Sequence, residues 1–177
     1  YEYLYLNPKF QNLFKLIEEH VLIYVKKFGF NTNKINIYFQ RAWATVSSKN
    51  QNISSHDHPQ SHISFAYYLK KSKLDGGITF IDKHKHNEFI KNSFGSRTLI
   101  EQKVIEKSTF LNSNSVNFSP EQDDIVIFPS KTLHATQINN TENTRISISA
   151  DITIISKNTA KIEQLITPID KWKKFAD

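Results

Sequence analysis

The chain has 177 residues, of which 38% are hydrophobic and 12% aromatic. This length predicts a single domain over residues 1–177, large enough to bury roughly 70% of its unfolded surface without a partner. The sequence contains no cysteine, which excludes disulfides, thiolate catalysis and sulfur-ligated zinc. Any transition-metal site must therefore use imidazole, carboxylate and water ligands.

The net charge of +6 comes from lysines spread over the termini and loops, which favours a solvated surface over a nucleic-acid site. The longest apolar run, residues 21–25, is too short to span a bilayer, and no signal peptide is visible. We therefore expect a soluble, intracellular protein of the cytoplasm, with neither a membrane partner nor a nucleic-acid partner.

Helical periodicity is found near both ends of the chain. Asn7 and Pro8 form an N-cap and first-turn pair, and apolar residues recur at helical spacing over residues 10–28, just before a glycine. Apolar residues return to this spacing over residues 162–175, where Pro168 is expected to kink or break the segment. The pattern predicts helices on both sides of a central region.

The central region, residues 35–155, has the alternating pattern of β-strands. Short strands in series, with no helices between them, predict a mainly β sandwich or barrel rather than a parallel α/β sheet. In the first strand, one face of the alternation carries Ile35, Ile37, Phe39, Arg41 and Trp43. Further strands are predicted at residues 63–69, 78–81, 98–104, 116–118, 125–128, 134–138 and 145–155.

The segment His56-Asp57-His58-Pro59 is the strongest candidate for chemistry. Side chains two apart on an extended segment point to the same face, so His56 and His58 can present two imidazoles to one ion. With the distant His134 they suggest an oxidative metal centre. A second pair, His84 and His86, lies in a lysine-rich polar stretch and is expected to be a solvated loop.

Six features in fixed order then identify a family. They are the H-x-H-P segment at 56–59, the strand end Tyr67-Tyr68-Leu69, Gly76-Gly77, Ile127-Phe128-Pro129, the distal His134 and Arg145-Ile146-Ser147. This ordered set resembles the 2-oxoglutarate/Fe(II) oxygenases related to prolyl hydroxylases, over about residues 41–151. The resemblance implies a double-stranded β-helix, or jelly roll, with Fe(II) held at one open end.

The resemblance also assigns the metal ligands. His56 and His134 would bind iron, while His58 stands where most of the superfamily has Asp or Glu. Asp57 is the alternative third ligand, but it faces away from His56 unless the strand is bulged. Three neutral imidazoles would lack the negative charge of a carboxylate ligand, which can change metal preference and redox poise.

The cosubstrate residues implied by the resemblance are Arg145, Ser147 and Tyr68. Arg145 is one of three arginines in the chain, and its two-pronged guanidinium suits the distal carboxylate of 2-oxoglutarate. Ser147 shares its strand face, and the hydroxyl of Tyr68 would reach the same carboxylate. The implied reaction consumes O2 and couples decarboxylation of 2-oxoglutarate to succinate with hydroxylation of a substrate C–H bond.

Several alternatives stay open. The substrate could be a peptidyl (prolyl) target, a free amino acid or a small metabolite, because fold analogy does not identify a substrate. A cupin-like three-histidine metal oxygenase would bind iron without 2-oxoglutarate, and a non-catalytic jelly-roll binding module would bind neither. Two local features complete the expectations: a lid at Lys83–Ser96, and a turn at Ser119–Asp124 in which Asp123 adopts the left-handed conformation where the family usually has Gly.

Overall fold

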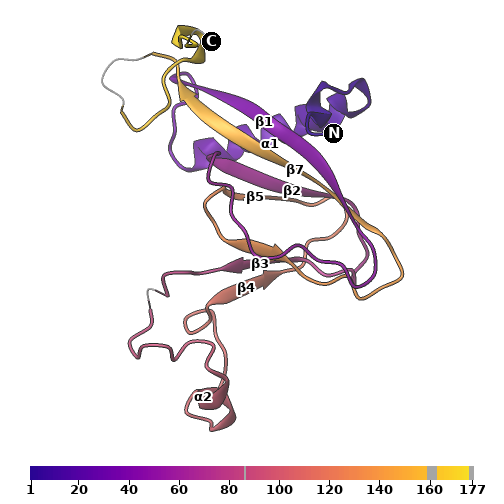
Figure 1. The fold of residues 1–177 in the computed structure, drawn as a ribbon, viewed down its shortest axis with the longest axis vertical. Helices are drawn as coiled ribbons and strands as arrows, with labels where there is room; N and C mark the ends of the chain where they lie inside the picture. The colour runs from indigo at the N-terminus through magenta and orange to yellow at the C-terminus, as the bar shows by residue number, and fades with distance from the viewer. Residues whose placement is uncertain (86, 159–162, 176–177) are drawn as a thin grey trace.

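The computed structural model describes residues 1–85, 87–158 and 163–175, and Figure 1 shows its fold. Two antiparallel sheets form the centre, with strand orders β1-β7-β2-β5 and β4-β3-β6. The strands are β1 (Ile35–Ser47), β2 (Ile63–Lys70), β3 (Ile78–Ile81), β4 (Ser115–Phe118), β5 (Ile125–Pro129), β6 (His134–Thr136) and β7 (Arg145–Ser156). The predicted mainly β, jelly-roll fold class is confirmed.

The N-terminal helix lies on one face of the four-stranded sheet. Two 3-10 turns, η1 (Leu4–Leu6) and η2 (Pro8–Phe10), lead into α1 (Gln11–Lys27), and the side chain of Asn7 accepts a hydrogen bond from the backbone N–H of Lys9 at 3.0 Å. Helical spacing places four buried α1 side chains on one stripe, which joins the apolar cluster of the sheet. These side chains are Phe14, Ile17, Val21 and Val25.

A β-bulge in β1 changes which residues face the helix. The register with β7 shifts between Phe39 and Arg41, so an extra residue, Gln40, reverses the alternation. Residues before the bulge pack with the helix-side core, whereas Trp43 lines the cleft on the opposite face of the sheet. The prediction that Ile35 and Trp43 share one face was therefore wrong. A period-two pattern in the sequence does not reveal where a one-residue bulge is inserted.

The strand predicted at residues 98–104 was also wrong. This segment contains a short helix, α2 (Arg97–Glu101), and no strand. Ser96 caps the helix by accepting a hydrogen bond from the backbone of Leu99, and Arg97 pairs with Glu101 one turn later at 2.7 Å. An N-cap and an i,i+4 ion pair are helical signals that outweighed the apolar residues here.

The predicted C-terminal helix is much shorter than its pattern suggested. Over residues 163–175 the structure has a β-bridge from Ile166 to Ile155 and one 3-10 turn, η3 (Ile169–Lys171). Pro168 lacks a backbone N–H and restrains the residue before it to extended conformations, which favours the bridge over a continuous helix. The start of the predicted segment, Ile162, lies outside the described residues.

The connection from β3 to β4 projects away from the sheets and carries α2 at its far end (Figure 1). The lid predicted at residues 83–96 belongs to this projection, and His86 of the second histidine pair lies outside the described residues. At the other end of β4, Asp123 has a φ of +69°, so the left-handed turn predicted there is confirmed. Over the described residues, no helix is long and apolar enough to cross a membrane.

Candidate metal centre and adjoining cleft

Three histidines converge between the two sheets. One ring nitrogen from each of His56, His58 and His134 lies within 4.8 Å of those of the other two. The ring centroids of His56 and His134 are 4.4 Å apart, and those of His58 and His134 are 5.3 Å apart. The fold thus brings together residues that are up to 78 positions apart in the sequence, and their spacing suits three ligands of one ion.

Backbone hydrogen bonds fix this arrangement. His56 and His134 exchange both of their N–H to C=O bonds at 2.9 Å, as an isolated antiparallel bridge. The N–H of His58 donates to the backbone carbonyl of Ser130 at 3.0 Å. Both links tie the loop before β2 to the segment that joins β5 and β6. Backbone hydrogen bonds within the protein therefore fix the relative positions of the three histidines.

The hydrogen bonds of the rings determine which nitrogen is available. Nδ1 of His56 lies 2.8 Å from the carbonyl oxygen of Ser54, and Nδ1 of His134 lies 2.8 Å from that of Thr132. Nδ1 of His58 lies 2.8 Å from a carboxylate oxygen of Asp151. Each of these oxygens accepts, so each Nδ1 donates, and Nε2 is the ring nitrogen left to face a metal in all three rings.

Burial keeps at least one of these rings neutral. His134 is buried, and the cost of burying a charge lowers the pKa of its imidazole. The carbonyl of Thr132 opposes this shift, while His56 and His58 add to it. A neutral imidazole is the form that coordinates a transition metal.

Asp57 points away from the three histidines. Its carboxylate forms an ion pair with Nζ of Lys83 at 3.0 Å, and this hydrogen bond is the main reason why the pKa of Asp57 is lowered. Its side chain is one-third exposed, whereas that of His58 is 11% exposed. The geometry therefore groups His58, and not Asp57, with His56 and His134.

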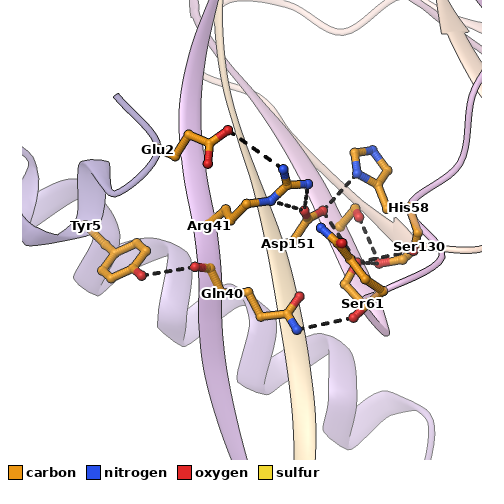
Figure 2. A network of polar contacts seen from close by, with 10 residues as sticks. Glu2, Tyr5, Gln40, Arg41, His58, Ser61, Ser130 and Asp151 are labelled. Atoms are coloured by element: carbon orange, nitrogen blue, oxygen red, sulfur yellow. Dashed lines mark hydrogen bonds and ion pairs between the residues drawn. The ribbon is translucent and has the colours of Figure 1, made fainter. Parts of the chain in front are cut away.

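His58 is held by a polar network that the sequence did not reveal (Figure 2). Asp151 has no exposed side-chain surface and uses both oxygens: Oδ1 accepts from His58, and Oδ2 accepts from Nε of Arg41 at 2.9 Å and from its Nη2. Burial alone would raise the pKa of Asp151, but the hydrogen bonds from His58 and Arg41 outweigh burial and lower it. Asp151 is therefore a buried carboxylate anion in contact with His58, a candidate metal ligand.

The only sequence signal for this network is weak. Asp151 interrupts an apolar strand, which marks it as a buried acid in need of a partner. Its partner Arg41 is 110 residues away and becomes its neighbour through strand pairing, which no local pattern specifies.

Arg145 lies in the same cleft as the histidines. It is 3% exposed, and burial lowers the pKa of its guanidinium. Nη1 donates to the backbone carbonyls of Asp75 at 2.7 Å and Gln137 at 3.1 Å, while Nη2 has one long contact of 3.5 Å to Oγ of Ser47. Over the described residues, Arg145 forms no ion pair with a carboxylate, because that of Asp75 is engaged by Ser72 and Thr141.

Tyr68 and Ser147 lie next to each other in the cleft that contains Arg145. Their Cα atoms are partners across β2 and β7, and both residues line the cleft together with Arg145 and the three histidines. Tyr68 is 3% exposed, and burial raises the pKa of its phenol to about 12, with Arg145 opposing the shift. Within the described part of the chain its hydroxyl has no hydrogen-bond partner, so a neutral donor is available for an anion.

Another histidine of the β region has a different role. Nδ1 of His62 accepts a hydrogen bond from the backbone N–H of Ile154 at 2.9 Å. His62 lines an apolar hollow beside the helix rather than the cleft that contains the three histidines. It therefore serves as a link between β2 and β7.

Comparison with known proteins gives one sequence match and several structural ones. The family profile described as "Putative 2OG-Fe(II) oxygenase" matches residues 41–151. A search of curated protein sequences finds no significant match. The matched segment contains every histidine described above and the three residues predicted to bind the cosubstrate, Tyr68, Arg145 and Ser147.

Among solved structures, a 2OG-Fe(II) oxygenase family oxidoreductase from Burkholderia pseudomallei is similar with a TM-score of 0.50 and 12% identity. The match covers 73% of this chain and 49% of that one, so the chain spans about half the length of that relative. HygX from Streptomyces hygroscopicus, solved with iron bound, has a TM-score of 0.43 and 13% identity, over 66% of this chain and 58% of its own. At this identity the first structure supports the fold alone.

Proposed function

Because the chain belongs to the 2OG-Fe(II) oxygenase family, whose cofactors are Fe(II), 2-oxoglutarate and O2, we propose that it is a hydroxylase that oxidises a substrate C–H bond. The observation that carries this proposal is one cleft lined both by the three clustered histidines and by Arg145, Tyr68 and Ser147. Fe(II), when bound, would supply the activation of O2 that accompanies decarboxylation of 2-oxoglutarate to succinate.

The proposed metal ligands are His56, His58 and His134. The donor set fits a transition metal, since imidazole is an ordinary ligand for iron and each of the three rings directs Nδ1 to an oxygen and keeps Nε2 for a ligand. The ion pair of Asp57 with Lys83 supports His58 as the third ligand in place of Asp57.

Arg145, Tyr68 and Ser147 are the proposed binding groups for the distal carboxylate of 2-oxoglutarate. A buried guanidinium without a carboxylate partner is costly, and an incoming carboxylate would offset that cost through Nη2 and Nε. Tyr68 stays protonated at neutral pH and can donate its O–H to the same carboxylate. Ser147, directly across the strand pair from Tyr68, can add a neutral hydrogen bond.

Arg145 is also what separates this proposal from the two alternatives. A cupin-like three-histidine oxygenase would need the histidines but would have no use for a buried cation in the cleft. A binding module without catalysis would need neither feature. The combination of metal ligands and a buried anion site favours the 2-oxoglutarate-dependent enzyme.

A peptidyl, prolyl-like target is the substrate that we propose to test first, and it rests on the resemblance of the H-x-H-P order to the relatives of prolyl hydroxylases. Free amino acids and small metabolites form the second set. Gain of one oxygen atom by a candidate substrate, measured by mass spectrometry together with equimolar succinate, would identify the target. Succinate formation with no oxygen gain in any candidate would contradict hydroxylation of these classes.

The decisive experiment is an anaerobic titration with Fe(II) and 2-oxoglutarate, monitored by the visible charge-transfer band of the chelate. The band is expected in the native protein, and it should be lost in His134→Ala and weakened in Arg145→Ala and Tyr68→Phe. Arg97→Ala is the matched arginine control, because Arg97 is exposed on α2 and pairs with Glu101. His20→Ala is the matched histidine control on the surface of α1.

Each outcome points to one function. Iron binding without the band would contradict the role of Arg145 and favour the cupin-like oxygenase. No iron binding would contradict the metal centre itself and favour a binding module. Circular dichroism of each variant separates loss of binding from loss of the fold.

A further inference from the structure

The three proposed ligands differ in what holds them. Nδ1 of His56 and Nδ1 of His134 donate to neutral backbone carbonyls, whereas Nδ1 of His58 donates to the carboxylate of Asp151. We propose that Asp151 is a positioning residue that delivers to the metal, through His58, the negative charge that the ligand set itself lacks. This inference rests on the proposed function.

The location of Asp151 supports this role. Its side chain is completely buried, so its charge is little screened by solvent. Oδ1 is committed to His58 at 2.8 Å, and Oδ2 is committed to Arg41. A carboxylate that accepts from one ring nitrogen fixes the ring plane and raises the basicity of the other nitrogen, which is the one that binds the metal.

The charges around Asp151 do not cancel its effect. Arg41 is its cationic partner, but the guanidinium is 34% exposed and also lies 3.8 Å from the carboxylate of Glu2. The row Glu2, Arg41, Asp151 therefore has two negative charges and one positive charge. The charge nearest to His58 is that of Asp151, and Arg41 is on the far side of it (Figure 2).

The fold devotes specific features to this contact. The bulge at Gln40 shifts the register of β1 against β7, and after this shift Arg41 lies directly opposite Asp151. Ser61 contributes a long contact of 3.4 Å to Oδ1, and its hydroxyl is held by Ser130 at 2.8 Å. If Asp151 served only to pair with Arg41, its second oxygen would have no need to face a proposed metal ligand.

The test measures metal affinity and the ligand field, with Co(II) as the probe and without turnover. Asp151→Asn keeps the shape and removes the charge, and we expect Co(II) affinity to fall about 10- to 100-fold, with a changed visible d–d spectrum. Arg41→Gln removes the cation but leaves the contact of Asp151 with His58, and we expect Co(II) affinity to be unchanged or higher. Arg97→Gln, which removes the exposed cation that pairs with Glu101 on α2, is the control and should change affinity by less than about threefold.

The pair of charge variants separates this role from a structural one. A structural ion pair would make Asp151→Asn and Arg41→Gln equally harmful, and that result would overturn the proposal, as would an Asp151→Asn variant with native affinity and spectrum. Thermal unfolding monitors the fold. If Asp151→Asn does not fold, Arg41→Gln decides: retained Co(II) affinity supports the proposal and a loss overturns it. Failure of the native protein to bind Co(II) or Fe(II) would instead contradict the metal centre on which the proposal rests.

Discussion

A side chain added at Gly76 would begin 3.1 Å from Nη1 of Arg145 and 2.8 Å from the backbone carbonyl of Ile138. Gly76 also has a φ of +76°, a conformation that favours glycine. Gly76, just before β3, is thus part of the arginine pocket, since the absence of a side chain there leaves room for Arg145 to reach the backbone carbonyl of Asp75.

Gly76→Ala should therefore weaken the binding of 2-oxoglutarate in addition to destabilising the fold. We expect a loss of about tenfold or more in 2-oxoglutarate affinity, because a carboxylate loses a correctly placed guanidinium, with Fe(II) affinity unchanged. Gly29→Ala is the matched control, since Gly29 has a φ of +79° but no atom within 4 Å of an added Cβ. Gly29→Ala should lose about 1 kcal/mol of stability from its positive φ alone, and Gly76→Ala should lose more, because its Cβ also meets the backbone carbonyl of Ile138 at 2.8 Å. An equal loss of 2-oxoglutarate binding in both variants would contradict the pocket.

The third metal ligand can be tested by comparing Asp57 with His58. Asp57→Asn should leave Fe(II) affinity within about threefold, because that carboxylate pairs with Lys83 outside the cluster. His58→Ala should reduce Fe(II) affinity by about 100-fold or more, as expected when one of three ligands is removed. Isothermal titration under anaerobic conditions measures both, and the reverse order would make Asp57 the ligand.

Tyr68 should make the stability of the protein fall at alkaline pH. Its pKa is raised to about 12 in the fold by burial, compared with 10.0 in the unfolded chain. The unfolded state therefore loses its proton first, so the contribution is fully present below pH 10 and is lost as the pH rises from 10 to 12. This difference between the two pKa values corresponds to about 3 kcal/mol of unfolding free energy.

The measurement is denaturant unfolding of the native protein and of Tyr68→Phe at several pH values between 9 and about 12. The native protein should lose stability more steeply than the variant over this interval. Parallel curves would show that the Tyr68 phenol titrates normally. The raised pKa would then no longer support its role as a neutral donor to 2-oxoglutarate.

The loop predicted to act as a lid, residues 83–96, can be tested by limited proteolysis. Lys83 at its start is tied to Asp57 beside the metal centre, so events in the cleft can be transmitted to the loop. Fe(II), 2-oxoglutarate and the true substrate together should slow its cleavage several-fold, as expected for a segment that closes over a site. Lys83→Ala should lessen this protection, and cleavage that is the same with and without ligands would contradict a lid.

The sequence alone was sufficient for the parts of the site that depend on local spacing. His56 and His58 share a face because they are two apart on an extended segment, and Arg145 shares a face with Ser147 for the same reason. Strand-like apolar patterns also located all seven strands of the described residues closely, because a strand with a buried face needs that period, while an eighth strand predicted at residues 98–104 was wrong. The ordered motifs then placed His134 and Tyr68 by family resemblance.

Tertiary structure decided the relationships that depend on register and on burial. The contact of Asp151 with His58 and Arg41 requires three segments to be aligned to within one residue, and the bulge at Gln40 sets that alignment. The same is true of Gly76 against Arg145. A sequence pattern reports which face a residue prefers, but it cannot report which residue lies opposite, because pairing energies between distant segments decide the register.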